Sequence, residues 1–174
     1  MSAFAKLPPF DDKGRVHMIV ETPRGATIKY KFDEKLRAFT VSRSLALGVA
    51  YPFDWGFVPS TKSDDGDAVD ALCVHDYGSF PGVVLPCRCL ALVDVDQLSS
   101  RGRIGNPRVI LAPDWQGSPK LGVELSEQAR AEIEQFFLSA TLFTGKDVRI
   151  AGWRDAAAAE AFIRSSTIKG SVGA

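Results

Sequence analysis

Short apolar segments separated by glycine and proline are the feature that most constrains how this chain can fold. These segments are rich in β-branched and aliphatic residues, and turn residues such as those of "PRGA" end the first of them. Strands are therefore predicted at 16–22, 27–32, 38–42, 71–76, 84–96 and 108–113. The aromatic segment 51–59 is bracketed by prolines, which disfavours a helix and predicts an ordered loop or a short strand.

Two helices are predicted after these strands. Ser126 can cap the first one, and five of its apolar residues share one face at helical spacing: Ala129, Ile133, Phe136, Phe137 and Ala140. Asp155 can cap a last helix through "AAAAEAFIRS". Many short strands followed by two helices favour a β-rich α+β fold, in which helices pack against a barrel.

Length and composition limit the classes of protein to consider. A chain of 174 residues favours a single domain spanning 1–174. The 21 basic residues equal the 21 acidic ones, so neither a general polyanion surface nor a nucleic-acid partner is expected. The start "MSAFAKLPPF" lacks the apolar run of a signal peptide, and no segment resembles a membrane span. Three cysteines in apolar surroundings predict buried thiols in a reducing cytoplasm.

The stretch "SDDGDAVDAL", residues 63–72, is the strongest candidate for a functional site. It places Asp64, Asp65, Asp67 and Asp70 within seven positions. Neighbouring like charges repel by about 1 kcal/mol per pair in water and about 4 kcal/mol near a protein surface. A turn at "DG" can bring three of these carboxylates together, which suits a hard cation, Mg²⁺ before Ca²⁺ or Zn²⁺. The alternative for an isolated DxDxxD pattern is a solvated acidic turn.

Several familiar sites do not fit the sequence. In an EF-hand frame started at Asp65, the sixth and twelfth places hold Asp70 and Asp76 rather than glycine and glutamate. The segment "FTGKDV" lacks the upstream glycine and the following Ser or Thr of a P-loop. The histidines, His17 and His75, are too few for an ordinary zinc site with cysteines this scattered.

The surroundings of the aspartate cluster resemble one family in several ordered segments. These segments are "ETPRGATIKYKF", "VSRSLALGVAYPFDWGFVPST", "DDGDAVDAL", "GVVLPCRCLALV", "IEQFF" and "GKDVRIAGW". Together they are similar to the soluble family I inorganic pyrophosphatases over roughly residues 15–165. The resemblance implies a closed five-stranded, OB-like β-barrel flanked by two or more helices. It also implies an inorganic diphosphatase that uses Mg²⁺, with Mn²⁺ as an alternative metal, and a homo-oligomer.

The resemblance also implies roles for individual residues. It assigns metal binding to Glu21, Asp65, Asp67 and Asp70, and it gives Asp67 the further role of a general base. It assigns phosphate binding and a part in catalysis to Lys29, Arg43 and Tyr51, with Arg108 as a further substrate contact. Taken singly, the basic residues of this set are typical of solvated surface positions, and Tyr51 is typical of packing.

The chain departs from the family pattern on the substrate side. Lys31 stands where the family has glutamate, Ser42 where it has aspartate, and Trp55 where it has a second tyrosine. Asn106 and Arg108 stand at the later Asp and Lys positions, and Asp94 or Asp96 is a candidate for the earlier Asp. Ala140 and Thr141 replace a helical Tyr-Lys pair. These changes predict slower hydrolysis, or alternatively a degenerate relative that binds a phosphorylated ligand or partner without efficient catalysis.

Overall fold

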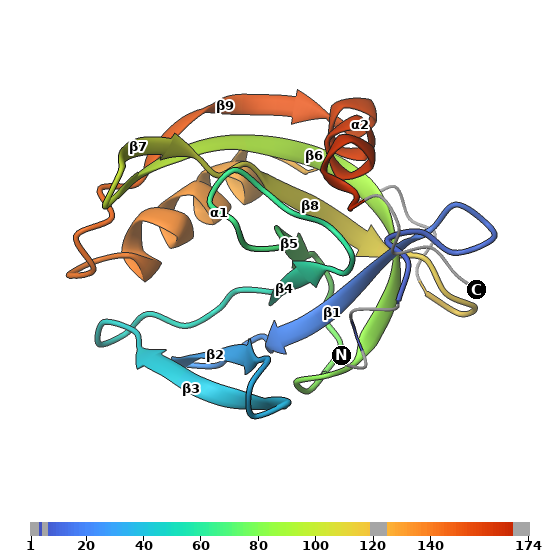
Figure 1. Ribbon diagram of the computed structural model, residues 1–174, viewed down its shortest axis with the longest axis horizontal. Coiled ribbons are helices and arrows are strands. Elements are labelled where there is room, and N and C mark those ends of the chain that lie inside the picture. The colour runs from blue at the N-terminus through green and yellow to red at the C-terminus, as the bar shows by residue number, and fades with distance from the viewer. Residues whose placement is uncertain (1–3, 5–6, 119–124, 169–174) are drawn as a thin grey trace.

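The structure is a computed structural model that describes residue 4, residues 7–118 and residues 125–168. Strands dominate the described residues, and two α-helices follow most of them in the chain (Figure 1). The elements are β1 (Val16–Thr22), β2 (Ile28–Asp33), β3 (Ala38–Ser44), β4 (Asp54–Val58), β5 (Val69–Cys73), β6 (Val84–Ser99), β7 (Gly102–Gly105), β8 (Arg108–Pro113), α1 (Glu127–Ala140), β9 (Arg149–Asp155) and α2 (Ala156–Ser166). The β-rich architecture with two helices is confirmed.

Strand pairing connects most of the strands into one curved sheet. Its order is β1-β4-β5-β8-β6-β7, and β6 pairs in addition with β9 and with β1. The pairs are antiparallel except for β5 with β8, which run parallel. The β2–β3 hairpin forms a separate two-stranded sheet below β1 and β4 in the view of Figure 1. A strand is found at each predicted place, but the one predicted at 71–76 is β5, which begins earlier and ends at Cys73, and β7 and β9 were not predicted.

The two helices begin where the sequence predicts. The hydroxyl of Ser126 accepts a hydrogen bond from the amide of Ala129, and the carboxylate of Asp155 accepts one from Ala158. The buried face of α1 consists of four of the five predicted residues, Ile133, Phe136, Phe137 and Ala140, whereas Ala129 in the first turn is only partly buried. It packs in a cluster with apolar residues of β4, β5, β6 and β8. The described parts of the chain contain no helix that is both long and apolar enough to cross a membrane.

A close approach of β1 and β4 requires glycine at position 56. A Cβ atom there would lie 1.9 Å from the carbonyl oxygen of Ile19, which is a backbone atom and cannot move aside. The pairing of Ile19 with Phe57 and of Val20 with Gly56 therefore depends on this glycine. The neighbouring residue, Trp55, pairs with Thr22 and Leu72, and its side chain takes part in the site described below.

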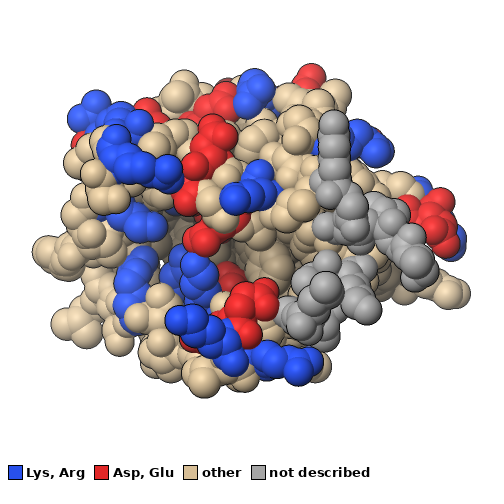
Figure 2. All heavy atoms as spheres, in the orientation of Figure 1, with Lys and Arg blue, Asp and Glu red and all other residues tan. Residues whose placement is uncertain are grey.

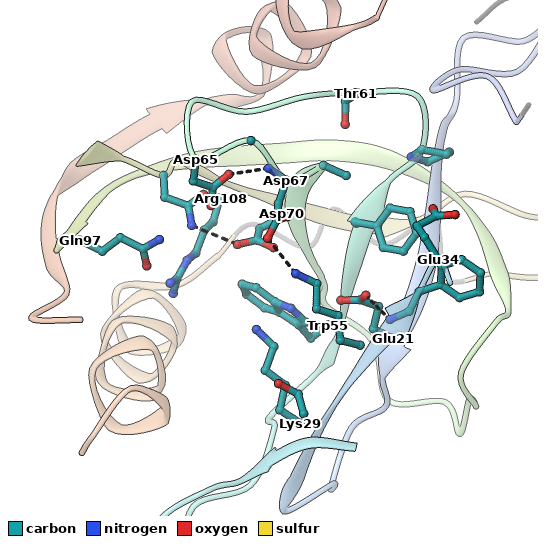
Figure 3. A pocket seen from close by; sticks show the side chains of 18 of the residues that line it. Glu21, Lys29, Glu34, Trp55, Thr61, Asp65, Asp67, Asp70, Gln97 and Arg108 are labelled. Carbon is teal, nitrogen blue, oxygen red and sulfur yellow. Dashed lines mark hydrogen bonds and ion pairs between the residues drawn. The ribbon is translucent and has the colours of Figure 1, made fainter. Parts of the chain in front are cut away.

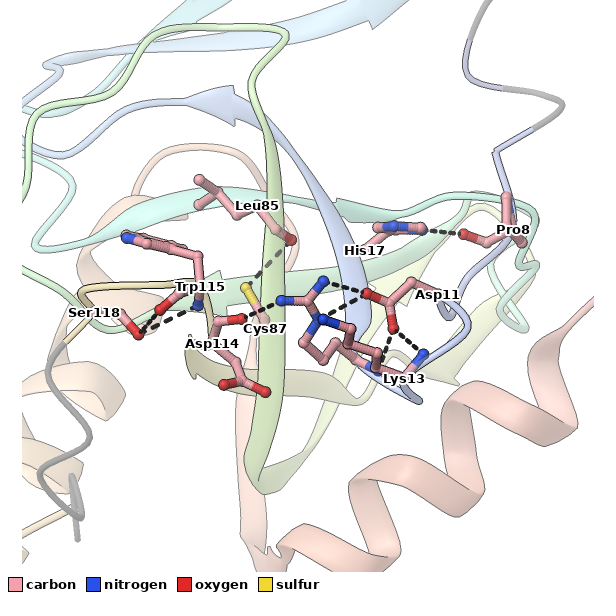
Figure 4. A network of polar contacts seen from close by, with 10 residues as sticks. Pro8, Asp11, Lys13, His17, Leu85, Cys87, Asp114, Trp115 and Ser118 are labelled. Carbon is pink, nitrogen blue, oxygen red and sulfur yellow. Dashed lines mark hydrogen bonds and ion pairs between the residues drawn. The ribbon is translucent and has the colours of Figure 1, made fainter.

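Both histidines make polar contacts within the protein. The Nδ1 atom of His17 lies 2.7 Å from the carbonyl oxygen of Pro8 (Figure 4), and Nε2 of His75 lies 2.9 Å from the buried carboxylate of Asp54. In the network of Figure 4, Arg15 also joins Asp11 to the backbone of Asp114. Each histidine therefore has a hydrogen-bond partner within the protein.

The cysteines are free thiols. Cys73 and Cys87 are buried with their sulfur atoms 3.6 Å apart, and Cys89 is partly buried. Burial and the neighbouring Cys73 raise the pKa of the Cys87 thiol. The prediction of buried thiols is confirmed for Cys73 and Cys87.

Candidate active site

A cleft of about 670 Å³ opens between the β2–β3 hairpin, the main sheet and the end of α1. Basic and acidic side chains gather around a hollow on the face shown in Figure 2. The charged residues that line the cleft are the acidic Glu21, Glu34, Asp65, Asp67 and Asp70 and the basic Lys29, Lys31, Arg43, Arg108 and Lys146. Five negative charges thus face five positive ones, and the formal charge of the lining is zero.

The turn after β4 brings three aspartates, Asp65, Asp67 and Asp70, into one cleft. Gly66 adopts a φ of 93°, a left-handed conformation that glycine tolerates, and its amide donates to the carbonyl of Ser63. The amide of Asp67 donates to Oδ1 of Asp65 at 3.1 Å, while Asp70 lies on β5. Because of this turn, all three carboxylates point into the same space (Figure 3). The predicted convergence of these side chains is therefore observed.

Electrostatic repulsion persists within the aspartate cluster. Burial raises the pKa of Asp65, and the charges of Asp70 and Asp67 raise it further against the hydrogen bond from Asp67. Asp70 also accepts a hydrogen bond of 3.3 Å from the amide group of Asn106, which lines the cleft as well. An external cation would relieve the remaining repulsion.

Glu21 of β1 is the most deeply buried carboxylate of the cleft. Its side chain lies under the β2–β3 hairpin with 7% of the residue exposed, and it accepts a hydrogen bond of 2.8 Å from the amide of Phe32. Burial raises the pKa of Glu21 to about 7, although this hydrogen bond and the charge of Lys29 act in the opposite direction. Glu21 can therefore carry a proton near neutral pH.

Lys31 reaches from β2 to the aspartate turn. Its Nζ atom lies 2.8 Å from Oδ2 of Asp67, an ion pair in which the lysine side chain is 51% exposed and the aspartate side chain 64% exposed. Partial burial lowers the pKa of Lys31, but the hydrogen bond to Asp67 and the charges of Asp67, Glu21 and Asp70 raise it overall. Three carboxylates thus act on one ammonium group.

The floor of the cleft holds a tryptophan between two cations. Nζ of Lys29 lies 5.6 Å and the guanidinium carbon of Arg108 lies 5.2 Å from the centre of the Trp55 ring. The guanidinium of Arg108 also lies 4.3 Å from the centre of the Phe137 ring. Burial lowers the pKa of both Lys29 and Arg108, and the charge of Asp70 opposes this shift in each. Cation–π contacts of this kind stabilise cations that burial has stripped of their hydration water.

Three buried polar atoms of this floor have no protein partner among the described residues. They are Nε1 of Trp55, Nε of Arg108 and Oε1 of Gln97, and all three residues line the cleft. Buried polar groups are nearly always hydrogen-bonded to protein, water or ligand. Two donors and one acceptor therefore remain for a polar ligand or for water.

The other two predicted substrate contacts, Arg43 and Tyr51, differ in whether they reach the cleft. Arg43 lines the cleft, and its guanidinium donates to the carbonyl of Ala140. Tyr51 is only 3% exposed and is not among the described residues that line the cleft; its ring packs against Phe136 and Trp55. Burial raises the pKa of Tyr51, while the charge of Arg43 lowers it. The Tyr51 hydroxyl therefore lies behind the residues that line the cleft, where the charge of Arg43 still affects its pKa.

The expectation that Asp94 or Asp96 supplies an acidic group is wrong. Asp94 pairs with Arg154, and Asp96 pairs with Arg103, and neither aspartate lines the cleft. Side chains alternate along β6, so the face of Val93 and Val95 continues with Gln97, which does line the cleft. The missed signal was this two-residue alternation, which identifies the neutral Gln97 as the residue on the inner face.

The turn after α1 supplies a cation that the sequence analysis missed, Lys146. Of the two residues expected at the Tyr-Lys positions, Thr141 lines the cleft, whereas Ala140 is buried in the core. Thr144 and Lys146, from the turn that follows, also line the cleft. The segment "GKDV" contains this lysine, but nothing in its local pattern places the side chain at the cleft.

The chemistry of the donors fits a hard divalent cation. Asp65, Asp67, Asp70 and Glu21 offer carboxylate oxygens, and Asn106 and Gln97 offer amide groups. Among the described residues, no three His, Cys, Asp or Glu side chains are already arranged around a common metal position. The oxygens of this donor set are therefore not yet gathered at one point, and one of them, on Asp67, is paired with Lys31.

Comparison with known proteins gives consistent matches across the chain. The sequence model of the family described as inorganic pyrophosphatase matches residues 18–169. An inorganic pyrophosphatase of Thermus thermophilus is 35% identical over 168 residues, which are 92% of this chain and 94% of that relative. One of a Nostoc species is 30% identical over 165 residues, 93% of this chain and 95% of the relative.

Solved structures give the same result. A crystal structure of inorganic pyrophosphatase from Thermus thermophilus matches with a TM-score of 0.83 at 33% identity, and the match covers 99% of this chain and 100% of that chain. An inorganic pyrophosphatase from Coxiella burnetii matches with a TM-score of 0.83 at 26% identity, covering 94% and 99% of the two chains.

Proposed function

The chain belongs to the inorganic pyrophosphatase family, and on this basis we propose that its cleft hydrolyses inorganic pyrophosphate to two phosphates with divalent metal ions. One observation carries the proposal: the turn of Asp65, Asp67 and Asp70 faces the cations of Lys29, Arg43 and Arg108 across a single cleft. Carboxylates suit the metal, and cations suit the phosphate oxygens.

We propose Mg²⁺ as the metal, with Mn²⁺ as an alternative, bound by Asp65, Asp67, Asp70 and Glu21. A bound cation of this kind would neutralise phosphate oxygens and lower the pKa of a water molecule toward about 7. The unrelieved repulsion at Asp65 and the oxygen-rich donors support this assignment.

Proton transfer and phosphate binding are then the roles of individual side chains. The carboxylate of Asp67 accepts a proton from the water whose oxygen forms the new bond to phosphorus, while the bridging P–O bond breaks. Lys29 acts as a point charge and Arg43 as a fork on the phosphate oxygens. Tyr51 lies behind the lining, so its hydroxyl would donate to phosphate only once the side chains in front of it move. Arg108 holds the leaving phosphate from the floor of the cleft. The buried Nε of Arg108 and Nε1 of Trp55, which lack a partner among the described residues, support a polar ligand at the floor of the cleft.

We also propose several features of the whole molecule. The pairings β1–β4, β4–β5, β5–β8, β8–β6 and β6–β1 support a closed OB-like barrel of five strands within a single domain, residues 1–174. Exposed Leu47, Leu142 and Phe143 support a homo-oligomer. The free cysteines support a cytoplasmic location.

Phosphate release from pyrophosphate in the presence of Mg²⁺ tests the proposed activity. We expect turnover that requires the metal and that exceeds the rate on nucleoside triphosphates, because the cations of Lys29, Arg43 and Arg108 lie in one cleft with the proposed metal ligands, which suits a small polyanion. Absence of release at every concentration of Mg²⁺ and Mn²⁺ would exclude hydrolysis. No finding favours the alternative of a binding protein without efficient catalysis, and this assay tests that alternative too.

Metal ions should stabilise the folded chain. A ligand that binds only the folded state at 100 times its Kd adds about 2.7 kcal/mol to the free energy of unfolding. A titration of the melting temperature with Mg²⁺ should therefore show a clear rise in the wild type and a much smaller rise in Asp70→Ala. An equal response of the two proteins would remove Asp70 from the metal site.

Replacing Arg108 should weaken transition-state binding. Loss of a charge-assisted contact costs about 1.5–3 kcal/mol, so kcat/KM of Arg108→Ala should fall roughly 10- to 150-fold. The exposed Arg101, which does not line the cleft, offers a control in Arg101→Ala. Because Arg108 is only 5% exposed, melting curves must show that the variant is folded at the assay temperature. Wild-type kinetics in folded Arg108→Ala would show that Arg108 does not touch the substrate.

A further inference from the structure

The balance of charge in the cleft depends strongly on Lys31. The lining holds five carboxylates and five cations, and the Lys31–Asp67 contact is the one ion pair between two lining residues within the described structure. Lys29 and Arg108 are instead stacked on Trp55, and Arg43 donates to a backbone carbonyl. Lys31 is thus the cation that directly neutralises the aspartate turn.

The geometry places the ammonium of Lys31 where negative charge is densest. It contacts Asp67 at 2.8 Å, and the carboxylates of Glu21 and Asp70 also act on it. These three carboxylates belong to the set proposed above for the metal. In the family pattern this position is a glutamate, so lysine here changes the local charge by two.

Stabilisation of the folded state does not account for the Lys31–Asp67 ion pair. Both side chains are about half exposed, and exposed ion pairs contribute little to stability because water screens them. The consequence of Lys31 is instead electrostatic, because a positive charge fixed beside the acidic turn repels a divalent cation that approaches the same oxygens.

We propose that Lys31 is a built-in counterion that replaces one divalent cation beside Asp67, so that this cleft binds fewer metal ions than its carboxylates would otherwise hold. This inference rests on the proposed function only in taking Glu21, Asp67 and Asp70 as metal-binding groups. Neutral Gln97 and Asn106 in the same lining agree with it, because the cleft then has fewer acidic groups to attract metal.

Binding of Mn²⁺, measured by the electron paramagnetic resonance signal of the free ion, tests the inference without any turnover. The proteins are the wild type, Lys31→Glu and Lys31→Gln. We expect Lys31→Glu to bind one more Mn²⁺ per chain than the wild type over the same range of free Mn²⁺, with a Kd for this added ion at least about tenfold lower than in the wild type, since the reversed charge attracts the dication. Lys31→Gln, which removes the charge without reversing it, should be intermediate in affinity.

A matched control is available on the same hairpin. Lys35 is exposed in the β2–β3 turn and does not line the cleft, so Lys35→Glu makes the same change in net charge elsewhere. Its Mn²⁺ binding should equal that of the wild type. An equal effect of Lys35→Glu and Lys31→Glu would overturn the inference, because only the net charge would then matter.

Two further outcomes separate this inference from others. If Lys31→Gln raises the KM for pyrophosphate and leaves Mn²⁺ binding unchanged, Lys31 is a substrate ligand and the inference is wrong. If the wild type fails to hydrolyse pyrophosphate while the Mn²⁺ results follow the expected order, the inference stands and the proposed function fails. Should Lys31→Glu not fold, the comparison of Lys31→Gln with the wild type decides alone.

Discussion

Asp67→Asn is expected to abolish most pyrophosphate hydrolysis, with a loss in kcat of about 10²–10⁴-fold. Asparagine preserves the shape of the side chain and can still accept a hydrogen bond from Lys31, but it cannot accept a proton from the attacking water. The main-chain contact of residue 67 with Asp65 does not involve the altered side chain, so the turn should persist. Steady-state kinetics at saturating Mg²⁺ measure the loss.

Two controls distinguish a missing base from a damaged metal site. Asp65→Asn should act mainly by raising the Mg²⁺ concentration needed for half-maximal rate, because Asp65 is proposed as a metal ligand. Asp64→Asn changes an exposed neighbour that does not line the cleft, and it should behave as the wild type. Equal kcat values in the wild type and in Asp67→Asn would reject Asp67 as the base.

Local sequence patterns predicted most of the fold because most of its elements have their own capping residues, turns and apolar spacing. The capping residues Ser126 and Asp155 and the apolar spacing of α1 need no distant contact to be recognised. The two missed strands lack such signals. The four residues of β7, "GRIG", include two glycines, and β9, "RIAGWRD", carries charges and a glycine. Their pairing with the long strand β6 determines their structure, and no short window of sequence contains that partner.

The candidate site was predictable to the extent that its residues lie in one turn. The aspartates of 65–70 are such a case, because the glycine turn brings them together. Alternation along β6 places Gln97 on the face of Val93 and Val95, so this residue could have been found from its spacing. The position of Lys146 depends on the path of the chain after α1, which spacing along the sequence does not reveal. The pairing of Lys31 with Asp67 likewise joins residues 36 positions apart.

Without metal, Glu21 should make the protein less stable as the pH rises. Its pKa in the folded chain is raised from 4.5 to about 7 by burial, so folding favours the protonated form. The stabilisation by Glu21 is therefore complete below pH 4.5 and is lost as the pH rises through 7. Since one pKa unit corresponds to about 1.36 kcal/mol, the ionised form costs about 3 kcal/mol above pH 7.

Glu21→Gln isolates this effect, because glutamine can still accept the hydrogen bond from the Phe32 amide and does not titrate. In urea unfolding with a chelator, the stability of Glu21→Gln relative to the wild type should increase by about 2.5 kcal/mol between pH 5 and pH 8. Glu34→Gln changes an exposed carboxylate of the same cleft and should show no comparable increase. A difference between Glu21→Gln and the wild type that is constant with pH would show that burial does not hold a proton on Glu21. At pH 8, Mg²⁺ should then stabilise the wild type more than Glu21→Gln, because a bound cation compensates only the ionised glutamate.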